Sequence, residues 1–178
     1  IGGTFQTFGY TLERFSGVKG WAYGAGSLPY VLINLNDGLH DDADENHANM
    51  TQNEFVLPRG LLAHPGTPNS AAALAVARFS APTSGVFRAY AGFRDVKRSP
   101  GRDGVKVCVM VDGHMAAYGS TSMESSPAGA TAVCSLDAGT LCLAAGSTVD
   151  FIVSPGESNN HDMTAWQGAI LKEADALD

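Results

Sequence analysis

Apolar and polar side chains alternate along most of this chain, and this period of two constrains the fold more than any other feature. Within residues 85–93, phenylalanine or alanine occupies every odd position from 87 onward. Valine occupies every odd position from 105 to 111, and Val149, Phe151 and Val153 repeat the pattern. Successive side chains of a β-strand point to opposite faces, so each of these segments is typical of a strand with one buried face.

Weaker alternation or short apolar runs predict further strands at residues 5–15, 29–34, 54–57, 74–79, 114–119, 131–143 and 166–170. Turn-forming residues separate them, and Asp112-Gly113 between two apolar runs predicts a two-residue hairpin. Many short strands joined by such turns indicate a sandwich or a barrel. We therefore expect an all-β domain over residues 1–171, a jelly-roll-like antiparallel β-sandwich with long polar loops. A C-terminal tail follows at 172–178, with a short helix at 171–177 as the best helical candidate.

Charge and hydropathy exclude several classes of partner. The chain of 178 residues carries a formal net charge of −7, which disfavours binding to nucleic acid or to an anionic membrane surface. No apolar run approaches the ~20 residues that span a bilayer. The first seven residues lack the basic start and apolar centre of a signal peptide, and residue 1 is Ile. We interpret the chain as a processed secreted protein, or an excised piece of one.

An acidic segment at residues 34–54 differs in character from the rest. It contains Asp, Glu, His and Asn with almost no apolar residues, and we expect a long, mobile surface loop there. Its histidines and carboxylates follow no zinc-ligand spacing. The triplet Asn49-Met50-Thr51 would accept a glycan at Asn49 in a eukaryotic secreted protein.

The three cysteines leave one pairing open. Cys108 lies within an alternating run, where a buried thiol is expected. Cys134 and Cys142 flank a turn signal at 136–140, so a hairpin would bring them close enough for a disulfide. The alternative is that all three thiols are free.

Several segments, taken in order, resemble a family of bacterial extracellular jelly-roll modules. They include Gly-Trp-Ala-Tyr-Gly at 20–24 and Ala-His-Pro-Gly at 63–66, and the remaining ones lie at 76–82, 84–87, 103–107, 111–113, 144–153 and 159–164. The resemblance covers roughly residues 17–171. It implies a secreted module of the carbohydrate-binding kind, found in multidomain proteins and binding carbohydrate or mediating adhesion. Phe79 stands where the family tends to have Trp, and the acidic insert has no counterpart in it.

An Asn- and Asp-rich loop at 157–162 precedes the last strand and is a candidate cation site. Ca²⁺ takes six to eight oxygen ligands, and Asp162, with Asn159 or Asn160 and Asp103, could supply several of them. Sandwich modules of the carbohydrate-binding kind often carry such a structural ion. The alternative is a turn in which Asp162 and Asn160 bond their own backbone.

The candidate ligand-binding residues are aromatic or basic. Tyr90 and Arg88 fall on the outward face of their strand, while Trp21 and Tyr23 lie in a glycine-rich segment where a ring can be exposed or packed in the core. His64 is either a buried structural histidine or a ligand contact.

No catalytic residues are predicted. A lyase site would need residues such as His64, Tyr90, Arg88 and Arg78 together, and nothing in the sequence joins them. No nucleophile elbow, phosphate loop or dinucleotide fingerprint occurs in a supporting context. Three hypotheses follow: a non-catalytic module that binds a glycan or a cell-surface protein, a structural jelly-roll subunit that assembles with other copies or domains, and a small polysaccharide lyase or hydrolase.

Overall fold

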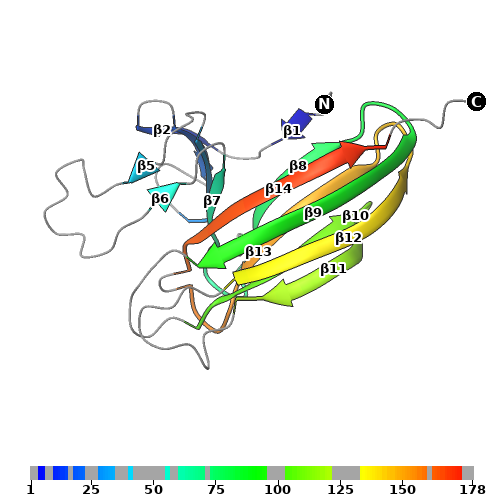
Figure 1. The fold of residues 1–178 in the computed structure, drawn as a ribbon. Helices are drawn as coiled ribbons and strands as arrows, with labels where there is room; N and C mark the ends of the chain where they lie inside the picture. Colours follow the sequence, from blue (N-terminus) through cyan, green and yellow to red (C-terminus); the bar gives the residue numbers. More distant parts are fainter. Residues whose placement is uncertain are drawn as a thin grey trace, which may run out of the picture.

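The computed structural model consists of antiparallel strands in two facing sheets and one small two-stranded sheet (Figure 1). It describes residues 28–33, 60–70, 73–95, 103–121, 133–159 and 162–173 in full, and the backbone alone of strand residues 4–6, 10–15, 18–22, 34, 40–41 and 55–56. No helix occurs in these residues, so none of them forms a helical membrane span. The all-β sandwich expected from the alternation is confirmed.

The first sheet has five strands, and the second has seven. The five-stranded sheet runs in the order β1 (Thr4–Gln6), β8 (Ala75–Ser80), β13 (Thr148–Pro155), β10 (Val105–Val111) and β11 (His114–Ser120). The seven-stranded sheet runs in the order β12 (Val133–Leu143), β9 (Gly85–Asp95), β14 (Thr164–Lys172), β7 (Leu61–His64), β4 (Tyr30–Asn34), β3 (Val18–Ala22) and β2 (Tyr10–Phe15). From β8 onward the chain crosses repeatedly between the sheets, as in jelly-roll sandwiches.

The alternating residues form the core between the sheets. Phe87, Phe93, Val107 and Phe151 are all buried, as predicted. Trp166 is 1% exposed, and its ring centroid lies 5.5 Å from that of Phe93 on the neighbouring strand and 5.6 Å from that of Phe151 on the facing sheet. Tilted aromatic pairs at such distances add to the free energy gained from burial. These rings therefore join the two sheets.

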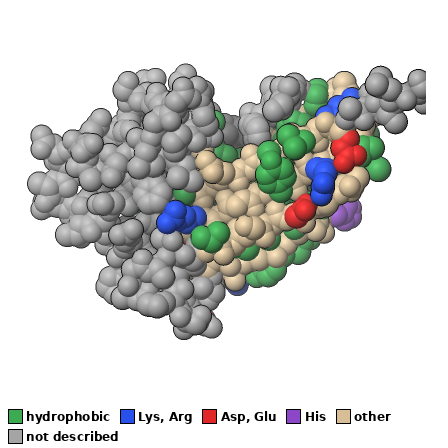
Figure 2. All heavy atoms as spheres, in the orientation of Figure 1, with side chains coloured by type: hydrophobic (Ala, Val, Ile, Leu, Met, Phe, Trp, Pro, Cys, Tyr) green, Lys and Arg blue, Asp and Glu red, His purple; other side chains and the backbone are tan. Residues whose placement is uncertain are grey.

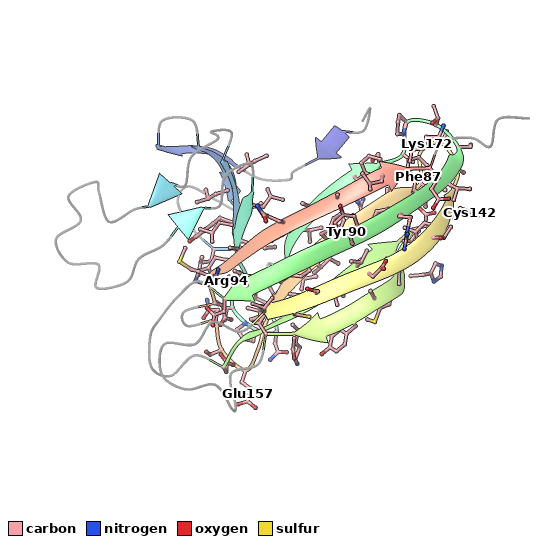
Figure 3. The ribbon with its side chains drawn as sticks, viewed as in Figure 1. Phe87, Tyr90, Arg94, Cys142, Glu157 and Lys172 are labelled. Atoms are coloured by element: carbon pink, nitrogen blue, oxygen red, sulfur yellow. The ribbon has the colours of Figure 1, made fainter. Side chains whose placement is uncertain are left out.

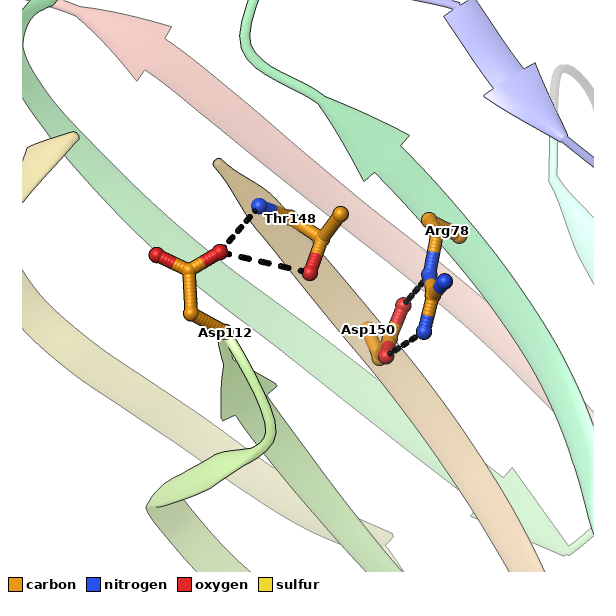
Figure 4. A network of polar contacts seen from close by, with 4 residues as sticks. All are labelled: Arg78, Asp112, Thr148 and Asp150. Carbon is orange, nitrogen blue, oxygen red and sulfur yellow. Dashed lines mark hydrogen bonds and ion pairs between the residues drawn. The ribbon is translucent and has the colours of Figure 1, made fainter. Parts of the chain in front are cut away.

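The Asp112-Gly113 hairpin is also confirmed. Val111 pairs with His114, and both turn residues have positive φ, 47° for Asp112 and 80° for Gly113. Two-residue turns of this kind match the twist of the flanking strands. One Asp112 carboxylate oxygen accepts a 2.7 Å hydrogen bond from the backbone N–H of Thr148, and this bond lowers the pKa of Asp112 (Figure 4). The side chain thus fastens the hairpin to β13.

Two strands of the seven-stranded sheet were not expected from the sequence. In β7, Leu62 and Ala63 are consecutive and both buried, so the strand has no alternation to detect. Leu62 pairs with Leu32 and Ala165 on the face opposite the main core, where β6 (Phe55–Val56) lies beside β4 and β7. β3 falls in the glycine-rich stretch that lacks an alternating pattern.

Two sequence expectations are corrected by the strand positions. The acidic segment was expected to be a loop throughout, but Asn34 ends β4, and His40 and Asp41 form β5 (His40–Asp41), which pairs with β6. The helix expected at 171–177 is wrong at its start, because Leu171 and Lys172 extend β14 in register with Arg88 and Phe87. Residues 174–178 lie outside the described part of the chain.

The central position of Trp166 leads to a stability prediction. Substitution Trp166→Ala should lower the free energy of unfolding by about 3–5 kcal/mol, because it removes a buried indole in contact with both sheets. Tyr90→Ala, at an exposed position on a neighbouring strand, should cost about 1 kcal/mol or less. Urea unfolding at constant pH measures both. Equal losses in the two variants would contradict the assigned core.

Candidate functional site

The outward face of β9 carries an aromatic ring and two guanidinium groups. Its core positions alternate with Arg88, Tyr90, Gly92 and Arg94, which point away from the facing sheet. Figure 2 looks onto this face, where separate hydrophobic and charged groups surround a continuous area of backbone and uncharged polar atoms. Figure 3 shows Tyr90 near the middle of β9 and Arg94 toward its end.

Gly92 has no side chain, so it leaves the surface of the sheet open two residues from Tyr90. We call this position the open floor. A Cβ built at Gly92 would have no other atom within 4 Å, so the surface is free above this position. Tyr90 is 47% exposed. Across the sheet, Gly92 pairs with Ser135 of β12 and Gln167 of β14, which are both exposed. Directly opposed residues on one sheet face lie about 5 Å apart, so a hydroxyl and an amide flank the floor.

A bulge in β12 places a carboxylate beside this surface. The register shifts between Asp137, opposite Tyr90, and Thr140, opposite Arg88. Gly139 within the bulge has φ 70°, and its N–H donates a 2.8 Å hydrogen bond to the Asp137 carboxylate. The other carboxylate oxygen lies 3.8 Å from an Arg88 nitrogen. Bulges commonly re-aim side chains in this way.

Together these groups can bind a polar ligand with flat apolar faces. The Tyr90 ring offers an apolar surface, and the surrounding hydroxyl, amide, carboxylate and guanidinium groups offer donors and acceptors. A sugar ring has this mixed character. None of these residues forms a nucleophile–base pair in the described interactions.

A second polar cluster lies at one end of the sandwich, around the loop that follows β13. The Asp103 carboxylate accepts hydrogen bonds from the backbone N–H groups of Glu157 and Ser158, the latter at 2.8 Å, and from the Ser158 hydroxyl at 3.2 Å. A Cβ at Gly156 would come within 2.6 Å of an Asp103 oxygen and 2.7 Å of the Gly104 carbonyl oxygen. Asp103 therefore clamps the loop, and only glycine fits at 156.

Asp162 is the member of this cluster whose two carboxylate oxygens both lack a hydrogen-bond partner. Its residue is 2% exposed, and neither carboxylate oxygen has a hydrogen-bond partner. Burial raises the pKa of Asp162 to about 7, and the charges of Asp103 and Asp95 add to this rise. The nearby backbone N–H of Gly156 offsets part of the rise without reaching hydrogen-bond geometry. Buried carboxylates normally have partners, so this one requires an explanation.

The sequence-predicted site residues separate into groups. Arg88 and Tyr90 lie together on the outward face of β9, while Asp103, Asn159 and Asp162 lie around the loop after β13. His64 is buried on β7 with its ring centroid 5.5 Å from that of Tyr30, and its Nδ1 lies 2.8 Å from the Pro65 carbonyl oxygen. Of the two roles considered for His64, a structural residue or a ligand contact, its burial therefore favours the structural one. Tyr23, Asn49, Asn160 and the side chain of Trp21 lie outside the described residues.

Of the two alternatives for Cys134 and Cys142, the disulfide is wrong. The segment between them is a bulge and not a turn, so both residues lie on one continuous strand, opposite Phe93 and Val86 of β9. Eight residues of extended strand span about 26 Å, far beyond the reach of a disulfide. All three cysteines are free, and burial raises the pKa of the Cys108 and Cys134 thiols.

The residues of the hypothetical lyase site do not meet. His64 is buried on β7, and Tyr90 and Arg88 lie on the outward face of β9. Arg78 lies on the five-stranded sheet, where its guanidinium donates two hydrogen bonds of 2.6 and 2.7 Å to Asp150 (Figure 4). Within the described residues, no three His, Cys, Asp or Glu side chains form a group that could hold a metal by themselves.

Sequence reasoning missed several members of both clusters. Arg94 and Gly92 could have been found, because they occupy the same outward positions of the alternating segment as Arg88 and Tyr90. Ser135, Gln167 and Asp95 could not have been found in this way. Their place depends on which strands pair and in which register.

The pKa of Asp162 predicts how metal-free protein responds to pH. The folded-state value of about 7 lies above the unfolded value of about 3.9, so the folded state binds this proton more tightly. In EDTA, the contribution of Asp162 to stability should be fully present below pH 4 and lost as pH rises to 7. Asp162→Asn should therefore exceed wild type in the free energy of unfolding at pH 8 but not at pH 4.

Urea unfolding at several pH values measures this difference. Asp112→Asn is a control of opposite sign, because hydrogen bonding lowers the pKa of Asp112 and its carboxylate stabilises the fold when ionised. A constant difference between Asp162→Asn and wild type from pH 4 to pH 8 would contradict the raised pKa.

No family model and no curated protein matches this sequence. One similar solved structure is the arabinose-bound α-L-arabinofuranosidase MgGH51, at 14% identity over 82% of this chain and 22% of that chain, with a TM-score of 0.41. Another contains the CBM51-2 and INT domains of Clostridium perfringens ZmpB, at 13% identity over 96% of this chain and 40% of that chain, with a TM-score of 0.41. The chain spans less than half the length of either structure. Similarity at this level assigns neither a family nor a ligand.

Proposed function

We propose that this domain is an extracellular, non-catalytic module that binds carbohydrate on the outward face of β12, β9 and β14. The observation that supports the proposal most directly is the half-exposed ring of Tyr90 beside the open floor above Gly92. A sugar ring could stack on the tyrosine while its hydroxyls reach the Ser135 hydroxyl and the Gln167 amide. An exposed, rigid platform of this kind loses little conformational entropy on binding.

The location on strands supports a preformed site. Tyr90 and Gly92 lie in the middle of β9, which is paired on both sides. Their alternate neighbours Ala89, Ala91 and Phe93 are buried in the core, so the backbone beneath the site is held firmly. Binding sites on strands are positioned more accurately than sites on loops.

We also propose that a Ca²⁺ ion occupies the cluster at the end of the sandwich. The buried carboxylate of Asp162, without a hydrogen-bond partner, is a fitting ligand for a hard cation. Asp103 and Asp162 would hold the ion, with the remaining oxygens from the adjacent loop, which includes Asn159. The ion would neutralise the carboxylates and join the loop to the start of β14, so its role would be structural.

The carbohydrate proposal predicts that binding depends on the aromatic ring of Tyr90. Tyr90→Ala should weaken binding to any polysaccharide ligand by at least tenfold, because stacked aromatic contacts dominate small, shallow sites. Tyr118→Ala is the matched control, since Tyr118 is 57% exposed but lies on the five-stranded sheet. A glycan array identifies the ligand, and isothermal titration calorimetry measures the affinities of both variants.

Two results would contradict the carbohydrate proposal. One is equal loss of binding in Tyr90→Ala and Tyr118→Ala. The other is absence of binding to every polysaccharide together with elution of the protein as a polymer, which would favour the structural-subunit hypothesis.

The calcium proposal predicts stabilisation by the metal. Adding millimolar CaCl₂ to EDTA-treated protein should raise the melting temperature of wild type by several degrees, since an ion that binds only the folded state stabilises it in proportion to the logarithm of its concentration. Asp162→Asn should abolish this rise, whereas Asp137→Asn, in the β12 bulge, should retain it. An equal rise in wild type and Asp162→Asn would show that Ca²⁺ binds elsewhere.

A further inference from the structure

Two arginines share the outward face of β9 with Tyr90. Arg88 and Arg94 are both exposed and stand on either side of the tyrosine, as the labelled Tyr90 and Arg94 illustrate in Figure 3. Six residues of extended strand separate them, or about 20 Å along the face. A row of guanidinium, aromatic ring, open floor and guanidinium therefore follows the strand.

Two arginines on one face of one strand are unusual in a chain with so few basic residues. The protein has only 11 Lys and Arg residues against 18 Asp and Glu, and its net charge is −7. A surface of that charge repels polyanions in general. On this face two guanidinium groups lie on the same strand surface as the exposed aromatic ring, and one of them, Arg88, lies beside the Asp137 carboxylate.

The carboxylate next to Arg88 is held only weakly. The Arg88–Asp137 contact is 3.8 Å long, and the two side chains are 54% and 64% exposed. Exposed ion pairs of this kind contribute about 0–1 kcal/mol. A ligand carboxylate or sulfate can thus replace Asp137 as the partner of Arg88 at little cost.

We propose that this face binds an anionic polysaccharide, laid along β9 with a sugar ring on Tyr90 and acidic groups on Arg88 and Arg94. The inference rests on the proposed carbohydrate-binding function and adds the charge of the ligand. Guanidinium groups form bidentate, charge-assisted hydrogen bonds with planar carboxylates and with phosphate-like oxyanions such as sulfate. The spacing of the arginines requires a ligand several sugar units long, with acidic groups on more than one unit.

The experiment uses pairs of polymers that share a backbone, one polymer of each pair being anionic and the other neutral. Dextran sulfate is compared with dextran, and polygalacturonate with its methyl ester, so each pair tests one source of the anion. Wild type should bind at least one anionic polymer more than tenfold tighter than its neutral partner. The affinity should fall as salt rises, because screening weakens exposed charge pairs.

The variants Arg88→Gln and Arg94→Gln test the two ends of the row. Each should weaken binding of the anionic polymer about tenfold or more, in line with the loss of a hydrogen bond to a charged group. Lys106→Gln is the matched control, because it removes one exposed positive charge from the five-stranded sheet and should leave affinity within about twofold. Arg88→Lys keeps the charge without the bidentate geometry and should fall between wild type and Arg88→Gln. Circular dichroism verifies that each variant is folded.

The outcomes separate the inference from the function on which it rests. Equal binding of charged and neutral polymers that depends on Tyr90 but not on the arginines would overturn the anionic ligand and leave the carbohydrate proposal standing. Equal losses of affinity in Lys106→Gln and Arg88→Gln would also overturn the inference, since they would indicate non-specific electrostatic attraction of the polymer to the whole protein surface. Absence of binding to charged and neutral polymers alike would overturn both proposals.

Discussion

The contact of Trp166 with Phe93 and Phe151 determines which side of each strand faces inward. The three rings come from three strands and two sheets, and they pack at centroid distances of 5.5 and 5.6 Å. Because side chains alternate along a strand, fixing Phe93 inward also fixes Tyr90, Gly92 and Arg94 outward. A slip of one residue in register would bury the arginines and expose the phenylalanines. The candidate binding face is thus a consequence of core packing.

The bulge in β12 shows how one local signal can have two structural outcomes. An Asp followed two residues later by Gly can close a hairpin or insert an extra residue into a strand, because both need a residue with positive φ. Here β9 pairs with β12 on both sides of the bulge, so the strand continues and the two flanking cysteines stay far apart. The long-range pairing with β9 decided between the two conformations.

Asp162 is a site of local conflict between burial and charge. A buried carboxylate without a hydrogen-bond partner costs free energy at neutral pH, and its raised pKa expresses that cost. Asp103 is held in place by its hydrogen bonds to the neighbouring loop, and its carboxylate therefore stays close to that of Asp162. Folded proteins retain such conflicts mainly at functional sites, and a bound cation would relieve this one.

The sequence by itself determined the fold class, the principal strands, the Asp112-Gly113 hairpin and the outward position of Tyr90 and Arg88. These depend on alternation and turn chemistry, which are local properties of the chain. Only the tertiary structure decided the neighbours of Tyr90, the isolation of Cys134 from Cys142, the burial of His64 and the approach of Asp103 to Asp162. Each of these depends on which distant strands pair and in what register, and a local pattern does not encode the partner of a strand.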